Sequence, residues 1–125
     1  MAKILVVQNQ AGKTATLRHL LMQQGHRTAV VSDAIRAIEW MADQVPDLVI
    51  TDYVMSAPLD GFGLIRFIRQ EPRLWRVRVI LCVDAHFKGL RDHALNCGAN
   101  EVWAADEVTL PAFAESIARM LQSPS

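Results

Sequence analysis

The stretch LVITD, residues 48–52, joins three consecutive apolar residues to a threonine and an aspartate. Its apolar part is continuous rather than alternating and is made of Leu, Val and Ile, which is typical of a strand covered on both faces. Similar short runs recur along the chain, and longer stretches with helical spacing separate them. The runs that we interpret as strands are Ile4–Val7, Ala29–Val31, Leu48–Ile50, Val77–Val83 and a weaker fifth, Val102–Ala105.

The stretches between these runs predict five helices with recognisable start and stop signals. Ser32 and Asp33 are good N-cap residues for the second helix, and Pro46 stops that helix. A glycine follows the first and fourth helices, as helix C-terminal caps require. The predicted helices are Lys13–Gln24, a second with Ala34, Ile38, Met41 and Val45 on one stripe, a third that opens at Asp60-Gly61 and ends before Pro72, His86–Cys97, and a fifth with Leu110, Phe113, Ala114, Ile117, Ala118 and Leu121 on one face.

A fivefold alternation of strand and helix predicts an α/β fold. We expect a doubly wound five-stranded parallel sheet of order 2-1-3-4-5 with helices on both faces. Residues 1–122 form the expected domain, and residues 123–125 a loose tail. In such folds the functional site lies at the carboxyl ends of the strands. The important loops are therefore those after Val7, Thr51, Val83 and Ala104.

Composition excludes several classes of protein. The chain has 125 residues, enough for one domain, and 13 basic residues balance 13 acidic ones, which argues against nucleic-acid binding by bulk charge. No apolar run approaches the roughly 20 residues of a membrane span or the roughly 7–15 of a signal-peptide core, so the cytoplasm is the expected location. The two cysteines, Cys82 and Cys97, sit in apolar surroundings and favour buried free thiols over a disulfide framework or zinc site.

Five motifs at characteristic positions carry a family resemblance. They are Lys3–Val7, Pro46–Asp52, Met55, Asp60-Gly61 and Gly98–Glu101. Together these motifs resemble the receiver domains of two-component response regulators over nearly the whole chain. The resemblance implies the flavodoxin-like version of the doubly wound fold and a role in phosphorelay signalling.

The resemblance also assigns roles to positions at the strand ends. Asp52 occupies the position of the aspartate that accepts a phosphoryl group from a histidine kinase. The family places an acidic pair for magnesium where this chain has Gln8 and Asn9, a hydroxyl where it has Val83, and a lysine where it has Ala105. Charges and donors that favour a phosphoaspartate are therefore missing. This pattern predicts a degenerate receiver, or pseudo-receiver, that works through protein contacts. We expect such a domain to bind no metal or other cofactor.

Two further departures concern the conformational switch of the family. The loop between Asp52 and Asp60 is one residue longer than usual, and the aromatic switch position falls on Val102 or Trp103. The usual docking and dimerisation face of the family corresponds here to His86–Leu121. We expect constitutive binding of a histidine kinase, a downstream signalling protein or a second copy through this face. Trp103 is the candidate anchor if its ring is exposed.

One alternative keeps the phosphoryl chemistry. In that interpretation Asp52 accepts a phosphoryl group, and Asn9, Asp60 or Asp84 helps it to hold magnesium. Without such help Asn9 and Asp52 are only weak metal candidates, because a neutral amide brings no charge.

Other motifs predict no enzyme. The segment Ala11-Gly12-Lys13-Thr14 imitates the end of a phosphate-binding P-loop, but Val7 stands where that motif needs glycine. No nucleophile–base pair accompanies it. A basic stretch from Arg66 to Arg78 contains Glu71 as its only acid. A solvated helix–loop face is the favoured interpretation of this stretch, and an acidic docking partner is the alternative.

Overall fold

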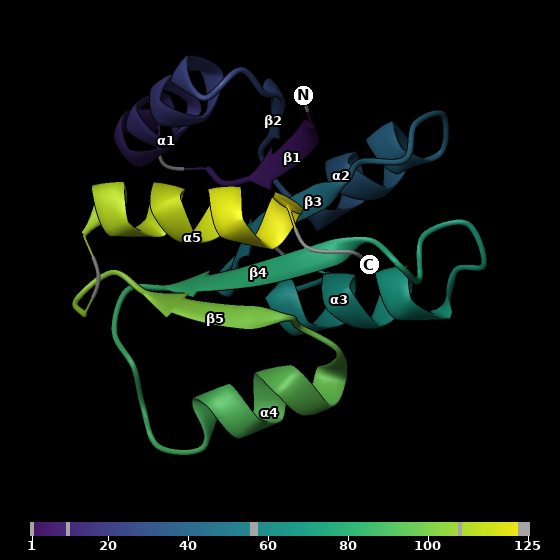
Figure 1. Cartoon of the computed structure of the whole chain (residues 1–125). Coiled ribbons are helices and arrows are strands. Elements are labelled where there is room, and N and C mark those ends of the chain that lie inside the picture. Colours follow the sequence, from purple (N-terminus) through teal and green to yellow (C-terminus); the bar gives the residue numbers. More distant parts are fainter. Residues whose placement is uncertain (1, 10, 56–57, 108, 123–125) are drawn as a thin grey trace.

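The computed structural model describes residues 2–9, 11–55, 58–107 and 109–122. Strands and helices alternate five times over these residues (Figure 1). All four neighbouring strand pairs are parallel, and the sheet order is β2-β1-β3-β4-β5, as the sequence predicts. The predicted tail, 123–125, lies outside the described residues. The elements are β1 Lys3–Val7, α1 Ala11–Gln23, β2 Arg27–Val31, α2 Ala34–Met41, β3 Leu48–Asp52, α3 Gly61–Gln70, β4 Arg78–Val83, α4 Leu90–Cys97, β5 Glu101–Ala104 and α5 Leu110–Gln122.

Helices cover the two faces of the sheet in a three-to-two division (Figure 1). Alternate residues of each strand point to opposite faces, so each strand feeds two separate apolar clusters. Leu5 and Val49 join the cluster under α2, α3 and α4, while Ile4 and Ile50 join the cluster under α1 and α5. The helices thus form two outer layers around a central sheet.

The three inner strands are buried on both faces, as their continuous apolar runs predict. Residues 4–7 of β1 and 48–51 of β3 are 0% exposed. The edge strands also contact both apolar clusters, since Ala29 and Val31 pack on one face and Val30 on the other. Their burial is less complete: in β2 residues 28–31 are only partly buried, and in β5 Trp103 is only partly buried. An edge strand has one strand neighbour, so its outer side stays open to solvent.

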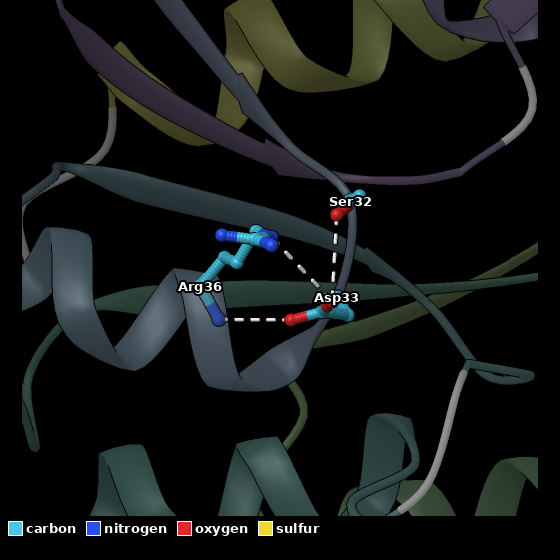
Figure 2. Close-up of polar contacts among 3 residues, drawn as sticks. All are labelled: Ser32, Asp33 and Arg36. Atoms are coloured by element: carbon cyan, nitrogen blue, oxygen red, sulfur yellow. Dashed lines mark hydrogen bonds and ion pairs between the residues drawn. The ribbon is translucent and has the colours of Figure 1, made fainter.

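Helix α2 begins where the sequence predicts and ends earlier. Figure 2 shows its N-cap: Asp33 accepts a hydrogen bond from the backbone N–H of Arg36 at 2.9 Å, and its other oxygen lies 3.8 Å from Nε of Arg36. The Ser32 hydroxyl also donates to Asp33 at 3.4 Å. Contrary to the prediction, the helix ends at Met41, and Val45 is 47% exposed. The residue before a proline avoids helical geometry, which excludes Val45 from the helix, and residues 42–43 already form a turn.

Helix α4 starts later than the sequence predicts. It begins at Leu90 rather than His86, because Gly89 has a left-handed backbone (φ +83°) that interrupts the helical path. Its end agrees with the prediction: Gly98 (φ +115°) caps the helix, and its N–H reaches the carbonyl oxygens of Ala94 and Leu95. The expectation of two buried thiols holds for Cys82 alone, because Cys97 is only partly buried.

Arg69 ties several segments together at the amino-terminal edge of the sheet. Its Nε donates to the Gly98 carbonyl at 2.8 Å, and Nη2 donates to Oδ1 of Asn100 at 2.8 Å. Nη1 donates to the carbonyls of Trp75 and Val77 at 2.9 and 2.5 Å. Burial lowers the pKa of Arg69 from its ordinary value, but an arginine side chain stays charged at pH 7. One side chain therefore fastens the end of α3 to the starts of β4 and β5.

We predict that Gly98→Ala destabilises the protein more than Gly25→Ala. Both glycines have positive φ, so each substitution carries backbone strain of about 1–3 kcal/mol. A methyl group at Gly98 would also lie 2.6 Å from Cγ of Arg69, whereas nothing lies within 4 Å of one at Gly25. Urea unfolding measures both losses. Equal losses would contradict the packing role of the Arg69 contact.

Candidate functional site

The carboxyl ends of β1, β3, β4 and β5 meet at one edge of the sheet, opposite the Arg69 network. Parallel registers place Val7 beside Thr51, Asp52 beside Cys82, and Val83 beside Ala104. The residues that follow these strand ends are the positions that the sequence singles out. The topology therefore gathers Gln8, Asp52, Val83 and Ala105 at one edge, as the predicted fold requires.

A chain of two hydrogen bonds joins β1, β3 and α1 at this edge. Nε2 of Gln8 donates to Oδ1 of Asp52 at 3.0 Å, and the Thr14 hydroxyl donates to Oε1 of Gln8 at 3.1 Å. Gln8 and Thr14 are each 8% exposed, while Asp52 is partly buried. The backbone of Gln8 is fixed as well, since its N–H donates to the Val31 carbonyl at 3.0 Å. Both ends of the Gln8 amide are therefore engaged.

The first turn of α3 packs directly on the end of β3. A Cβ atom at Gly61 would lie 2.5 Å from the carbonyl oxygen of Asp52, so only glycine fits there. The Gly61 N–H donates to the Tyr53 carbonyl at 2.9 Å. Asp60 caps the helix, with Oδ1 accepting from the Gly63 N–H at 2.9 Å. The Asp60 carboxylate therefore engages this cap, rather than joining Asp52 as a second ligand for magnesium.

Neither of the predicted positions 83 and 105 carries a polar or charged side chain. Val83 is buried and apolar, and Ala105 is exposed with its N–H bonded to the Val83 carbonyl at 2.9 Å. Asn9 and Asp84 are both exposed. The segment that resembles the end of a P-loop, residues 11–14, lies at the start of α1. Its backbone is therefore helical and does not form a loop around a phosphate.

A divalent cation does not fit the residues present. A carboxylate oxygen accepts hydrogen bonds, so the Gln8 atom that faces Asp52 is the amide nitrogen, which cannot ligate a metal. The amide oxygen is engaged by Thr14. No group of three or more His, Cys, Asp or Glu residues that could hold a metal occurs in the described part of the chain. Magnesium prefers several oxygen ligands with near-octahedral geometry. Of the other acidic residues near these strand ends, Asp60 caps α3 and Asp84 is exposed.

Trp103 lies on the face of the sheet covered by α5. Its ring stacks on Phe113, with centroids 3.7 Å apart and planes 10° from parallel. The ring is partly buried, and its Nε1 is buried with no hydrogen-bond partner among the residues described. Val102, the other candidate for the switch position, is buried in the opposite cluster under α3 and α4. The Trp103 ring thus packs against α5. Only part of the ring is exposed, which limits the surface it could offer as a binding anchor.

Two features of this region escape sequence reasoning. Thr14 was part of the P-loop resemblance, and its bond to Gln8 depends on how α1 packs beside β1. An aromatic group forms next to the site: the Tyr53 ring lies 4.8 Å from Phe62, and Phe62 lies 4.4 Å from His93. These residues come from separate segments, so no spacing in the sequence signals their contact.

The family model of the response regulator receiver domain matches residues 4–104. The chain belongs to this family. Response regulator PleD of Caulobacter vibrioides is 28% identical over 120 residues, which cover 94% of this chain and 26% of PleD. This receiver domain therefore spans about a quarter of the length of that relative. No helix among the described residues is long and apolar enough to cross a membrane.

Solved structures of receiver domains agree with the fold. The receiver domain of a signal transduction histidine kinase from Syntrophus aciditrophicus is 26% identical and has a TM-score of 0.86, with 100% of this chain and 96% of that chain covered. The receiver domain of a sensor histidine kinase from Pseudomonas aeruginosa, solved with magnesium in its active-site cleft, is 26% identical with a TM-score of 0.80 and coverages of 97% and 94%.

We predict energetic coupling between Thr14 and Gln8. Thr14→Val keeps the side-chain volume and removes the hydroxyl that donates to Gln8, so it destabilises the receiver domain by about 1 kcal/mol. In a Gln8→Ala background that bond is already absent, and Thr14→Val should cost less. Urea unfolding of the two single variants and the double variant measures the coupling. Strictly additive losses would show that the two side chains act independently.

Proposed function

We propose that this receiver domain is a non-enzymatic signalling module in a two-component pathway and acts through phosphorylation-independent protein contacts. The observation that carries the proposal is the hydrogen bond from the Gln8 amide to Asp52. In this protein a neutral donor faces the carboxylate at the place where the family has an acidic pair. We also propose that the module works in the cytoplasm and needs no cofactor.

Electrostatics supports this proposal. Phosphoryl transfer to a carboxylate brings two negative groups together, and proteins that catalyse it supply compensating positive charge. Here Gln8 supplies a dipole, Val83 offers no hydroxyl and Ala105 no cation. A phosphoryl group at Asp52 would therefore find few contacts that differ between two conformations. A ligand without such differential contacts cannot shift a conformational equilibrium.

The alternative function is phosphoryl acceptance at Asp52 from a histidine kinase. One observation favours it: Asp52 is retained at the end of β3 and is only partly buried, so its carboxylate is not sealed from solvent. In this alternative magnesium assists Asp52; the solved receiver domain of the Pseudomonas aeruginosa kinase holds that ion in its active-site cleft. The polar contacts of Gln8 would then have to break.

The proposed partner is a histidine kinase, a downstream signalling protein or a second copy of the chain. We assign the contact to the face formed by α4, β5 and α5, within His86–Leu121. Exposed apolar side chains support an interface there, since Phe87 is 50% and Leu95 is 45% exposed. Trp103 stays a candidate anchor, although its ring stacks on Phe113.

Magnesium and beryllofluoride, a phosphoryl mimic, should leave the amide NMR signals around Asp52 unchanged at millimolar concentrations. The reason is that Gln8 presents an amide nitrogen to the carboxylate where a metal ligand would have to stand. A variant with Gln8→Asp, Asn9→Asp, Val83→Thr and Ala105→Lys serves as the control, because it restores the charges and donors of the family. This variant should show saturable shifts. Saturable shifts of the unaltered receiver domain would instead favour phosphoryl acceptance.

Trp103→Ala should lower stability by about 3 kcal/mol, because it removes a large ring stacked on Phe113. Trp103→Phe keeps an aromatic ring and should lose less. Thermal unfolding measures stability, and sedimentation together with partner pull-down measures association by the folded protein. Loss of association with stability nearly kept would make Trp103 an anchor. Normal association by the surviving folded fraction would end that hypothesis.

A further inference from the structure

Two hollows rich in arginine lie at the amino-terminal edge of the sheet, away from Asp52. One has a volume of about 710 Å³ and lies between the start of β3, the loop after α3 and the end of α5. The other, of about 950 Å³, lies between that loop, the start of β5 and α5. Figure 1 shows the loop after α3 and the C-terminal end of α5 at the same side of the molecule. Arg76 and Arg78 line both hollows, so the hollows adjoin at these two side chains, and we refer to the pair of hollows as the groove.

Positive charge is concentrated in this groove although the chain as a whole is neutral. Its lining includes five arginines and two carboxylates, those of Asp47 and Glu101. The Asp47 carboxylate accepts the backbone N–H of Lys3 at 2.7 Å. Burial lowers the pKa of His26 from its ordinary value, so this lining residue adds little to the positive charge of the groove near neutral pH. The five arginines are Arg69, Arg73, Arg76, Arg78 and Arg119.

Two of these arginines direct their donors to uncharged oxygens. Arg69 donates four hydrogen bonds, three to backbone carbonyl oxygens and one to the amide oxygen of Asn100. Arg73 donates to the Met41 carbonyl at 2.7 and 3.1 Å and to the Ala42 carbonyl at 3.3 Å. Such bonds fix the guanidinium groups without cancelling their charge. Both side chains therefore add positive potential to the groove, which favours an anionic ligand.

Trp75 adds an apolar contact between the positive charges. Its side chain is 52% exposed, and the Arg76 guanidinium lies 4.8 Å from the ring centroid. Arg76 is itself exposed. Tryptophan and arginine are the residues that most often dominate the binding energy of protein interfaces. An exposed pair of this kind suits a ligand that carries both acidic and apolar groups.

We infer that this groove, centred on Trp75, Arg76 and Arg78, binds an acidic peptide segment of a partner protein. Arg69 and Arg73 already donate hydrogen bonds to backbone oxygens. They therefore contribute positive charge to the groove, but their N–H groups do not converge on one point as a compact phosphate would require. Carboxylates spaced along an extended peptide match charges spread over two adjoining hollows. A nucleic acid would need a longer basic stripe than one groove on a neutral chain. This surface goes beyond the face proposed above, because its central residues Trp75, Arg76 and Arg78 belong to the loop after α3 and the start of β4, outside His86–Leu121.

Fluorescence anisotropy with a labelled synthetic peptide of alternating Glu and Leu tests the inference. The intact receiver domain should bind this peptide, more weakly as salt is raised, and should not bind the same peptide with Gln in place of Glu. Arg76→Glu should weaken binding about tenfold. The matched control is Arg66→Glu, which makes the same charge change at an exposed position of α3 outside the groove. The control should bind like the unaltered protein, and urea unfolding verifies that both variants fold.

Several outcomes would overturn the inference. They are absence of binding at millimolar peptide, equal weakening by Arg66→Glu and Arg76→Glu, or tighter binding of a single-stranded oligonucleotide of equal charge. Full competition by inorganic phosphate at the peptide's own concentration would point to a phosphate site instead. These results are independent of the signals around Asp52, so failure here leaves the proposed function untouched.

Discussion

Burial of β1, β3 and β4 on both faces is the constraint on which the rest of the structure depends. A polar side chain inside this sandwich would lose its water without gaining partners, which costs several kcal/mol for a charge. Chemistry is thereby confined to the two edges where the strands begin and end. Gln8 and Asp52 stand at one edge, and Arg69 stands at the other. At each edge hydrogen bonds from or to uncharged groups stabilise a partly buried charge.

At the carboxyl edge the charge is that of Asp52, and a neutral amide donates a hydrogen bond to it. Gln8 satisfies one oxygen of Asp52, and Thr14 satisfies the amide oxygen in turn. Within this chain Oδ1 of Asp52, both polar atoms of the Gln8 amide and the Thr14 hydroxyl each have a partner at hydrogen-bond distance. A cation at this place would have to displace the amide nitrogen of Gln8 and would gain no charged ligand from residue 8. The same bonds that stabilise the edge support the proposal that this receiver domain works without a metal.

Much of the fold could be predicted because its signals are local. Continuous apolar runs such as Leu48–Ile50 mark two-sided strands, and Gly98 and Asp33 mark helix ends by their own backbone or side-chain chemistry. Prediction failed at Gly89, because glycine is compatible with both a helix start and a left-handed turn, and only the course of the chain decides between them. Asp52 and Gln8 were singled out by position, whereas their direct contact required the packed structure.

Long-range contacts explain what remained hidden at both edges. Arg69 lies within a basic stretch that sequence reasoning assigns to a solvated face, yet it reaches Asn100, 31 residues away. Gly98 must be glycine partly because of that side chain, so a local cap signal also reports a distant contact. No periodicity within one element encodes such a pairing. Sequence patterns therefore predicted which residues stand at an edge and not which of them touch.

Helix α3 connects the two edges as a rigid element. Its first residue lies against the carbonyl of Asp52, where no side chain fits, and Asp60 caps that end. Near its other end Arg69 holds the starts of β4 and β5 through four hydrogen bonds. Because α3 is fixed at both ends, the groove and the Asp52 edge keep a set spacing. A ligand at the groove meets an ordered surface and has little conformational entropy to remove on binding. A preformed surface of this kind is what the proposed phosphorylation-independent function requires.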